Sequence, residues 1–576
     1  MATVPWGAAV LAVAVIAASM WYLAGRALTL PQVFSDELIY MEAARTLAEH
    51  GAVQGHYGIA VPAFDAIAYL LAPNQIGAYH LIQLMNSAAM ASAAFPAYLL
   101  ARRALPRSWA LAVSALTVSV PWMVYARFVM TEAVFYPVFL WFVLALVRAL
   151  ERPTRRRQLI LLLVGALAFA VRAQAAVLFP AIGLAVLLYG AAQGSVRAAV
   201  KSFAFTWLVA CAGGVLAIAA ATSGAWHPFG AYGVLLRGWW HPHGLLLWAA
   251  ANVTSLSLGV GILVAAASPL GAAALLRRGN TASEQALAAA AVSSTLALLV
   301  TVVVLSESTY GLGTVHERNL FYVVPLLLIC ALAWAARAFP ASRRMLAATL
   351  AASIGLALLM PAGTLEGSSF DALSLKYWTR LGPGWLAPHT MIVVAVTVGA
   401  IVLVVARSTT LLIATFVLAT VGVASASDYH TDVPRSQTAN YQWVDRALPA
   451  HAHATLLWID CSAPSCPAAH PAASVGPMSV YTELFNSRIT NVGHIGTDNP
   501  SRGLATEAFN LGADGTVLRG GTAIRSRYVV VDSRIAIKGV RVSLLKSTDV
   551  GEGSAGGHAA LALWRTNGVV RLRSAG

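Results

Sequence analysis

The stretch TEAVFYPVFLWFVLALVRALERPTRRR, residues 131–157, contains the two kinds of boundary that recur along the chain. It opens with the isolated carboxylate of Glu132, continues as an apolar run long enough to cross a bilayer, and ends in a cluster of arginines. Short loops rich in arginine stay on the cytoplasmic side of a membrane. The stretch therefore predicts a transmembrane helix whose Glu132 end lies on the extracytoplasmic side.

The same alternation extends over residues 1–426. Apolar runs start near Pro5, Gln75, Trp109, Glu132, Leu159, Gln174, Ser202, Leu245, Ala282, Leu320, Met345, His389 and Thr409. If the first run crosses outward, the basic clusters share one face: Arg102/Arg103/Arg107, Arg148/Arg152/Arg155/Arg156/Arg157, Arg197/Lys201, Arg277/Arg278, Arg337/Arg343/Arg344 and Arg407. The other face collects Ser35-Asp36-Glu37, Arg127 to Glu132, Arg172 and His316-Glu317-Arg318. We predict about thirteen transmembrane helices and a cytoplasmic N-terminus.

The composition is that of a multi-pass protein of the plasma membrane. Of 576 residues, 59% are hydrophobic and only 11% are charged, with a mean hydropathy of +0.71. The net charge of +15 does not indicate a nucleic-acid partner, because most arginines fall in short loops where topology and anionic lipid explain them.

One part of the apolar region needs a special interpretation. Residues 158–192 are interrupted by Arg172-Ala-Gln174 and then by Pro180, yet basic clusters flank both ends. Both ends must therefore lie on the cytoplasmic face. This predicts a helical hairpin with Arg172 at its tip.

Residues 427–576 are polar and mixed, which predicts a separate domain. Five segments are typical of β-strands between Gly, Ser and Asp turns: Ala454–Ile459, Arg527–Val531, Arg541–Leu545, Ala559–Trp564 and Val569–Leu572. An odd number of spans places this β-rich domain outside the cytoplasm, and its length of about 150 residues suits an independent domain.

Two cysteines support an extracytoplasmic position for that domain. Cys461 and Cys466 lie in one short polar loop and could close a disulfide in an oxidising compartment. Zinc is the alternative, although His470 alone does not supply the second ligand pair that zinc sites use. Cys211 and Cys330 lie within apolar runs and are interpreted as buried small hydrophobic residues.

Motifs of soluble enzymes are missing from the sequence. It contains no Gly-rich phosphate loop, no Gly-x-Ser-x-Gly elbow and no zincin helix. A mechanism driven by ATP or a nucleotide sugar therefore has no support. We expect an activated substrate to arrive within the membrane.

The first extracytoplasmic segment, residues 35–49, predicts a short amphipathic helix in the membrane interface. Asp36 and Glu37 follow directly after the first span, where a carboxylate pair can meet a lipid headgroup. The alternative is that Ser35 caps the helix and the two acids only complement its dipole.

Further charged residues lie at the same predicted membrane surface. Glu132 opens an apolar span, where its alternative role is a local pair with Arg127. Arg318 comes directly after His316 and Glu317 in the sequence, and it precedes another span. The alternative is that Arg318 only snorkels to the membrane interface. However, arginines on this face run against the positive-inside bias, and the planar fork of a guanidinium is suited to binding phosphate.

Together these segments resemble the GT-C superfamily of integral-membrane glycosyltransferases. The resemblance rests on the acidic pair, the interfacial helix, Asn86 and three motifs: PAYLLARR at 96–103, TEAVFYP at 131–137 and RNLFYVVP at 318–325. It covers residues 1–425 and is to the type that uses polyprenyl-phosphate sugars, in particular to actinobacterial arabinofuranosyltransferases of cell-wall biogenesis. The C-terminal domain more loosely resembles the carbohydrate-binding-like domains of such enzymes.

The resemblance implies transfer of a sugar from a polyprenyl-monophosphate donor to a cell-envelope glycan or lipid-linked acceptor, with inversion in one displacement. Asp36 would be the general base, while Glu37 and Glu132 would orient the sugar or acceptor, or bind a divalent cation (Mg2+, Mn2+ or Ca2+). The donor phosphate would be bound by four basic residues: Arg318, Arg172, His316 and Arg127. In this family the acidic motif is sometimes Asp-Asp or Asp-x-Asp, so the Asp-Glu pair leaves the roles of Asp36 and Glu37 open.

Two other classes remain open on the sequence. A polysaccharide or lipid transporter or flippase would also need many spans, but it should contain paired broken helices in an internal repeat. A membrane-embedded polymerase or acyltransferase could use the same carboxylates. The sequence does not identify the sugar, the linkage or the acceptor.

Overall fold

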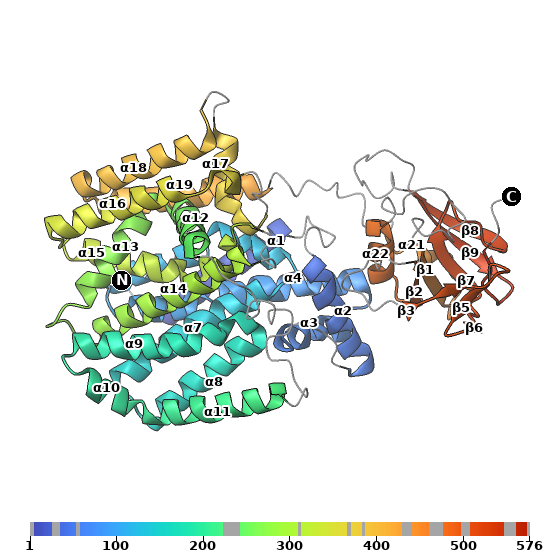
Figure 1. Ribbon diagram of the computed structural model, residues 1–576, viewed down its shortest axis with the longest axis horizontal. Helices are drawn as coiled ribbons and strands as arrows, with labels where there is room; N and C mark the ends of the chain where they lie inside the picture. The colour runs from blue at the N-terminus through green and yellow to red at the C-terminus, as the bar shows by residue number, and fades with distance from the viewer. Residues whose placement is uncertain are drawn as a thin grey trace.

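The computed structural model describes residues 5–25, 35–52, 58–222, 242–308, 313–365, 370–382, 386–428, 441–459, 476–496, 507–546 and 560–572. Most of these residues form a bundle of helices, and a mixed sheet lies beyond one end of it (Figure 1). The predicted fold class, a polytopic helical protein with a β-rich C-terminal region, is confirmed. The predicted boundary between residues 426 and 427 stays a prediction.

The bundle contains α-helices and short 3-10 helices (η). Its first half comprises α1 Trp6–Gly25, α2 Ser35–His50, α3 Ala60–Leu71, α4 Gln75–Ala91, α5 Ala94–Ala101, α6 Arg107–Thr117, η1 Pro121–Arg127, α7 Thr131–Glu151, α8 Arg155–Val171, η2 Ala173–Val177, α9 Leu178–Ala192, α10 Val196–Ser202 and α11 Ala204–Thr222. Its second half comprises α12 Pro242–Val260, α13 Ile262–Leu275, α14 Ala282–Glu307, η5 Glu317–Asn319, η6 Phe321–Val323, α15 Val324–Ala336, α16 Arg343–Leu359, η7 Ala362–Leu365, η8 Phe370–Ala372, α17 Leu373–Leu381, α18 Pro388–Ala406 and α19 Thr409–Asp428.

Each predicted apolar run corresponds to a helix that begins close to the predicted residue. Seven described helices are long and apolar enough to cross a membrane, or up to nine if each of two bent pairs is one span. Four further apolar helices are shorter: Ala60–Leu71, Ile262–Leu275, Phe321–Ala336 and Thr409–Ser425. The hairpin predicted for residues 158–192 is confirmed, because Arg172 lies between α8 and α9.

Local sequence explains where several helices start and break. Thr281 and Glu284 form a reciprocal capping box at the start of α14. Gly261, with φ +86°, separates α12 from α13. A Cβ at Gly261 would lie 2.8 Å from the backbone of Thr415 in α19, so only glycine permits this close crossing.

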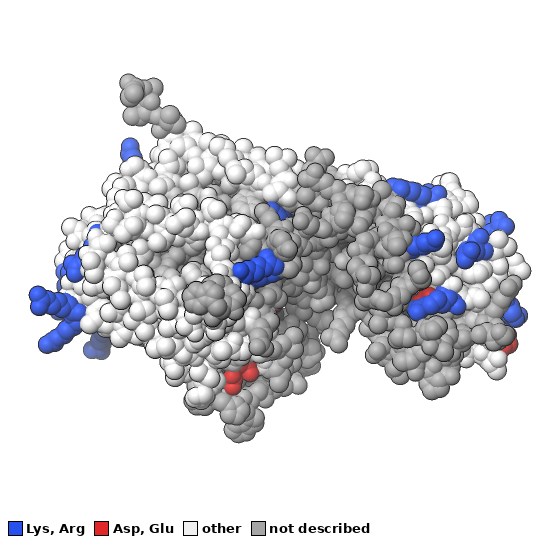
Figure 2. Space-filling model, turned by 90° about the horizontal axis from the view of Figure 1, so that it is seen from above, with Lys and Arg blue, Asp and Glu red and all other residues white. Residues whose placement is uncertain are grey.

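The basic clusters meet at one end of the bundle, which we call the basic end. There Arg103 bonds the carboxylate of Glu151, and Arg337 bonds that of Glu284, linking loops distant in sequence. Figure 2 shows Lys and Arg side chains gathered at the end of the bundle far from the sheet. The side of the bundle seen in this view carries very few charged side chains. This is the end predicted to face the cytoplasm, and the assignment of compartments stays a prediction.

The C-terminal region contains helices α21 Trp443–Ala447 and α22 Gly476–Phe485 and the strands β1 Ala454–Ile459, β2 Ile489–Ile495, β3 Glu507–Ala508, β4 Asn510–Leu511, β5 Val517–Arg519, β6 Thr522–Ala523, β7 Tyr528–Asp532, β8 Gly539–Lys546 and β9 Ala560–Thr566. The main sheet has the order β3-β2-β1-β7-β9-β8, and β4, β5 and β6 form a small second sheet. Strands β3, β2, β1 and β7 pair in parallel, whereas β9 is antiparallel to both neighbours.

The strand predictions hold for four of the five segments. The segment Val569–Leu572 makes only isolated bridges to residues 516, 525 and 537, so it is not a strand of either sheet. Cys461, Cys466 and His470 lie outside the described residues, and the disulfide and its zinc alternative stay predictions. Cys330 is buried as expected, but Cys211 is exposed, because α11 lies at the margin of the bundle and most of its side chains face outward.

The C-terminal region contacts the bundle through α22. Phe485 packs edge-on against Tyr79 of α4, with ring centroids 6.3 Å apart. Glu483, only 6% exposed, faces Glu42 and Arg45 of α2. Helix α2, which is predicted to lie in the membrane interface, is thus in contact with both the bundle and the C-terminal region, at the end opposite the basic end (Figure 1).

Candidate active site

The polar residues predicted to share a membrane surface gather at the end of the bundle next to the C-terminal region, which we call the site end. Glu37 of α2 is fully buried, and its Oε1 accepts a hydrogen bond of 2.9 Å from the backbone N–H of Val129. Asp36 precedes it in the first turn of α2, with a side chain outside the described residues. Glu37 is therefore fixed to the loop that leads into α7.

Helix α4 holds the same loop from the other side. Gln83 donates to the carbonyl oxygen of Arg127 at 3.1 Å, and Asn86 donates to that of Phe128 at 2.8 Å. Phe128 and Met130 have extended backbones, so their polar groups need partners from other elements. Asn86, part of the family resemblance, thus has a physical role: it positions the segment that carries Glu132.

Glu132 forms a buried ion pair with Arg172 at the hairpin tip. Glu132 Oε1 lies 2.9 Å from Arg172 Nη1, and the two side chains are 1% and 5% exposed. The partner is thus Arg172 rather than the sequence neighbour Arg127, whose guanidinium lies 5.9 Å from the ring centre of Trp21. A buried charge of this kind is tolerated only when it is paired and hydrogen-bonded.

Arg172 has further partners on several elements. Its guanidinium donates to Thr131 Oγ1 at 3.0 Å, Tyr322 Oη at 2.7 Å, Asn319 Oδ1 at 2.5 Å and Gln174 Oε1 at 2.8 Å. Arg172 therefore joins α7, η2, η5 and η6. Its donors are committed to the protein, which fits an organising role for Arg172 better than direct binding of a ligand.

Arg318 is the more accessible arginine of the site. Its Nε lies 2.5 Å from Oδ1 of Asp371 in η8, and the side chains are 13% and 18% exposed. Asp371 and Arg318 also act electrostatically on the hydroxyl of Tyr125, as do Glu317 and Glu132. These charged groups therefore form one cluster around Tyr125.

Glu317 anchors the loop that carries His316 and Arg318. It is fully buried, and its carboxylate accepts hydrogen bonds from Trp122 Nε1 at 2.6 Å, Ser374 Oγ at 2.7 Å and Ser255 Oγ. Burial raises the pKa of Glu317 to about 7, although these hydrogen bonds oppose the shift. The loop is therefore tied to η1, α12 and α17.

His316 lies beside this anchor. Its backbone N–H donates to Asn252 Oδ1 at 3.2 Å, and its ring Nε2 lies 3.4 Å from Thr314 Oγ1. The ring is only 8% exposed. His316 therefore lies in the same loop as Glu317 and Arg318, and its backbone is fixed by α12.

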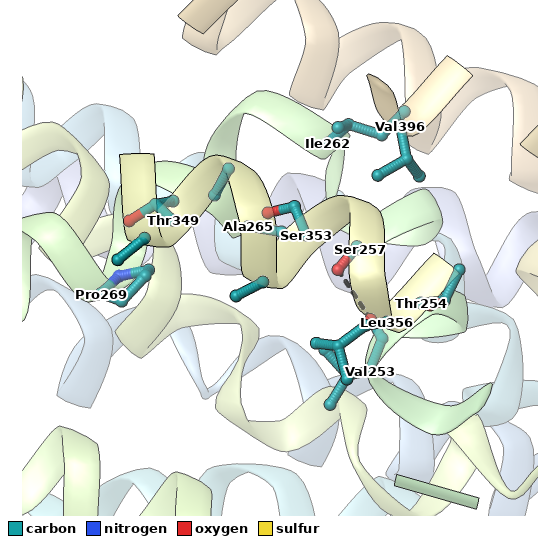
Figure 3. A pocket seen from close by; sticks show the side chains of 13 residues that line it. Val253, Thr254, Ser257, Ile262, Ala265, Pro269, Thr349, Ser353, Leu356 and Val396 are labelled. Carbon is teal, nitrogen blue, oxygen red and sulfur yellow. Dashed lines mark hydrogen bonds between the residues drawn. The ribbon is translucent and has the colours of Figure 1, made fainter. Parts of the chain in front are cut away.

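An apolar cavity of about 330 Å³ lies on another face of α12, between α13, α16 and α18 (Figure 3). Val253, Thr254 and Ser257 line it from α12, and the Ser257 hydroxyl donates to the Val253 carbonyl oxygen at 2.7 Å. Ser255, on the same helix, instead binds Glu317. Helix α12 therefore separates the polar cluster from a space suited to an apolar chain.

Within the described part of the chain, no group of three or more His, Cys, Asp or Glu side chains is placed to hold a metal ion. Glu132 is compensated by Arg172, and Glu37 binds a backbone N–H. The set proposed for a divalent cation also includes Asp36, whose side chain is not among those described. The cation stays a proposal.

The structure brings some of the predicted site residues together and adds others that the sequence analysis did not name. Glu132, Arg172 and Arg318 lie close to one another, whereas Glu37 and Arg127 are linked through the backbone of the loop before α7. The roles assigned to these residues stay predictions. Asn319 and Tyr322 were not predicted as site residues, although they lie inside the RNLFYVVP motif, which could have pointed to them. Asp371 lies in a polar stretch without a motif, so its only signal was an isolated acid close to α17.

Comparison with known proteins identifies the fold. No family model and no curated protein matches the sequence. Among solved structures, the chain is similar to ArnT from Cupriavidus metallidurans, both bound to undecaprenyl phosphate and in the apo state. Each comparison has a TM-score of 0.51 and 13% identity and covers 97% of this chain, with 98% and 97% of the ArnT chains covered.

The oligosaccharyltransferase of Archaeoglobus fulgidus is a more distant neighbour, with a TM-score of 0.41, 13% identity, and coverage of 83% of this chain and 64% of that chain. The ArnT likeness extends over nearly the whole chain, including the C-terminal region. The protein therefore has a fold similar to that of ArnT, which agrees with the fold class predicted from the sequence.

Proposed function

We propose that the protein is a membrane glycosyltransferase that takes a sugar from a polyprenyl-monophosphate donor. The observation that carries the proposal is the cluster at the site end, where the Glu132–Arg172 pair lies beside the partly exposed Arg318–Asp371 pair. The fold supports it, since the similar ArnT structure was solved with undecaprenyl phosphate. The finer proposal is an arabinofuranosyltransferase that acts on an acceptor of an actinobacterial cell envelope.

The chemistry follows from the donor. An acceptor hydroxyl oxygen forms a bond to the anomeric carbon while the bond from that carbon to the phosphate oxygen breaks, which inverts the centre. Asp36 takes the hydroxyl proton as general base, and the polyprenyl phosphate leaves with the electron pair. Glu37, held by Val129, keeps α2 and hence Asp36 in position.

The leaving phosphate needs positive charge where negative charge develops. We assign this role first to Arg318, because its side chain is more exposed than that of Arg172. Its pairing with Asp371 prevents an unpaired charge before the donor arrives. Arg172 positions Glu132 and the loop of Arg318 instead, while His316 and Arg127 stay proposed as secondary contacts.

The cavity in Figure 3 suits the isoprenoid chain of the donor. Its walls are apolar, and α12 connects it to the polar cluster. Filling it with Ala352→Trp should raise the donor concentration needed for half-maximal rate. Ala351→Trp, on an exposed neighbour that does not line the cavity, should leave that concentration unchanged.

The function is tested with purified protein in nanodiscs, a polyprenyl-phosphoryl arabinofuranose and an envelope glycan acceptor, without ATP. We expect release of polyprenyl phosphate and a labelled glycan. Movement of the intact lipid across the membrane without cleavage would instead support a flippase. A series of donors with other sugars tests the arabinofuranosyl proposal separately.

The orientation is tested independently in cells. Cysteines at Ala104, at the basic end, and at Val540, exposed on β8, should differ in labelling by a membrane-impermeant reagent. Only position 540 should react if the N-terminus is cytoplasmic and the C-terminal region is extracytoplasmic. Labelling at position 104 in intact cells would contradict the proposed sidedness.

A further inference from the structure

A second cavity lies at the basic end, between α7 and α8, and the proposed reaction does not use it. Its volume is about 540 Å³. Residues of one face of α7, including Trp141, Ala145 and Arg148, line it together with Arg157 and Ile160 of α8. The cavity thus combines cationic and apolar walls, and it lies at the opposite end of the bundle from Glu132.

The arginines of this cavity form no close ion pair with the described part of the protein. Arg148, Arg156 and Arg157 all line it, and in the described part of the chain none of them forms a salt bridge. The nearby carboxylate of Glu151 bonds Arg103 and Ser283 instead. Three guanidinium groups therefore face one cavity with no carboxylate bound to them.

The arrangement of these arginines is partly fixed. Arg157 Nη1 donates to the backbone carbonyl of Arg148 at 2.8 Å, which holds its guanidinium at the cavity. Arg103 and Arg157 each repel Arg148 more strongly than Glu151 attracts it, and an anion placed between the arginines would relieve this repulsion. Guanidinium groups suit phosphate oxygens through their planar fork of donors.

The apolar part extends from the arginines along the helices. Trp141 is seven residues before Arg148, so the lining of α7 extends over about 10 Å. Ile160 and Val164 continue the wall on α8. Trp141 is 39% exposed and Ile160 44% exposed, so the cavity opens toward the space that lipid chains occupy.

We propose that this cavity is a binding site for one anionic phospholipid of the leaflet at the basic end. Its phosphate binds Arg148, Arg156 and Arg157, and one acyl chain lies against Ala145 and Ile160. The positive charge of the loop between α7 and α8 is enough to explain why this loop is predicted to stay on the cytoplasmic side. It does not explain why three arginines share a cavity with an apolar wall. A free phosphate would gain nothing from that wall, so the lipid is the occupant that both parts fit.

The test measures binding of phosphatidylglycerol to the full-length protein in detergent by native mass spectrometry, with phosphatidylcholine as the neutral comparison. We expect one tightly bound phosphatidylglycerol and no comparable binding of phosphatidylcholine. Arg156→Gln/Arg157→Gln should weaken phosphatidylglycerol binding roughly 25–30-fold. Each basic residue near a membrane surface contributes about 1 kcal/mol, which is about fivefold in affinity, and two residues are removed. Arg277→Gln/Arg278→Gln removes the same charge from another exposed loop of the basic end and should leave the binding unchanged.

A second pair of variants tests the apolar wall with the charge intact. Ala145→Phe fills the cavity and should weaken phosphatidylglycerol binding, whereas Ala166→Phe on the exposed face of α8 should not.

Equal loss of binding in both arginine double variants would overturn the proposal, since binding would then follow net charge. Normal binding to Ala145→Phe with an unchanged thermal transition would overturn it as well. Inorganic phosphate competing as well as the lipid would also contradict the assigned occupant.

Discussion

The two ends of the bundle place several of their arginines in different surroundings. At the site end, Arg172 is 5% exposed and paired with a carboxylate from another helix. At the basic end, Arg156, Arg277 and Arg278 are exposed and form no salt bridge among the described residues. Burial explains the contrast, because a buried guanidinium without a partner is very unfavourable whereas water and headgroups solvate an exposed one. The topology of the protein can therefore account for an exposed arginine without a partner, whereas a buried arginine needs a partner that forms an ion pair or hydrogen bonds with it.

The largest expected effect lies at the site end, where Asp36→Asn removes the proposed base with almost no change in shape. Turnover should fall by roughly 10²–10⁴-fold, the usual contribution of a general base, while donor binding and thermal stability stay close to those of the parent protein. Single-turnover rates and donor binding measure the two effects. If Asp36→Asn keeps near-normal turnover while Glu132→Gln does not, Asp36 is not the base.

The next effect compares matched arginines at the two ends. Arg172→Ala leaves the buried carboxylate of Glu132 without its ion pair and should lower the free energy of unfolding by about 3–5 kcal/mol. Arg278→Ala removes an exposed guanidinium at the basic end and should change it by less than about 0.5 kcal/mol. Thermal or denaturant unfolding in the same detergent gives both values. Similar values for the two variants would show that the contrast in burial has no energetic consequence.

The sequence predicts the features of this protein that depend on local residues, but not the pairs of buried residues that only the fold brings together. Helix positions and the gathering of charges at two ends were predictable because apolar runs and arginine clusters are local features. The partner of Glu132 was not, since Arg127 is near in sequence whereas Arg172 becomes near only when α7 packs against the hairpin. Asp371 was missed for the same reason, because only the fold brings it to Arg318.

A smaller effect is expected at Arg318, the proposed phosphate ligand. Arg318→Ala should weaken donor binding by roughly 10–100-fold, the value of a charge-assisted hydrogen bond, and should also slow turnover. Arg318→Lys should recover only part of this loss, because an ammonium keeps the charge but not the bidentate fork. Donor binding and single-turnover rates of both variants are the measurement. Full activity in Arg318→Lys would favour an arginine that only snorkels to the interface.

The smallest effect concerns the contact between α22 and α2. Burial raises the pKa of Glu483 from an ordinary 4.5 to about 8, and the facing carboxylate of Glu42 adds to the shift while Arg45 opposes it. The folded state therefore binds this proton more tightly than the unfolded state. The contribution to stability is fully present below about pH 4.5 and is lost as pH rises to about 8.

We expect this loss to be about 1–2 kcal/mol, because the interface can admit water once the carboxylate ionises. Glu483→Gln should remove the dependence between pH 4.5 and pH 8, measured as the midpoint of thermal unfolding against pH. Glu507→Gln, an exposed carboxylate of β3, is the control and should keep the dependence of the parent protein. A parent midpoint that rises over this range would show that Glu483 is ionised in the folded protein, with Arg45 the dominant neighbour.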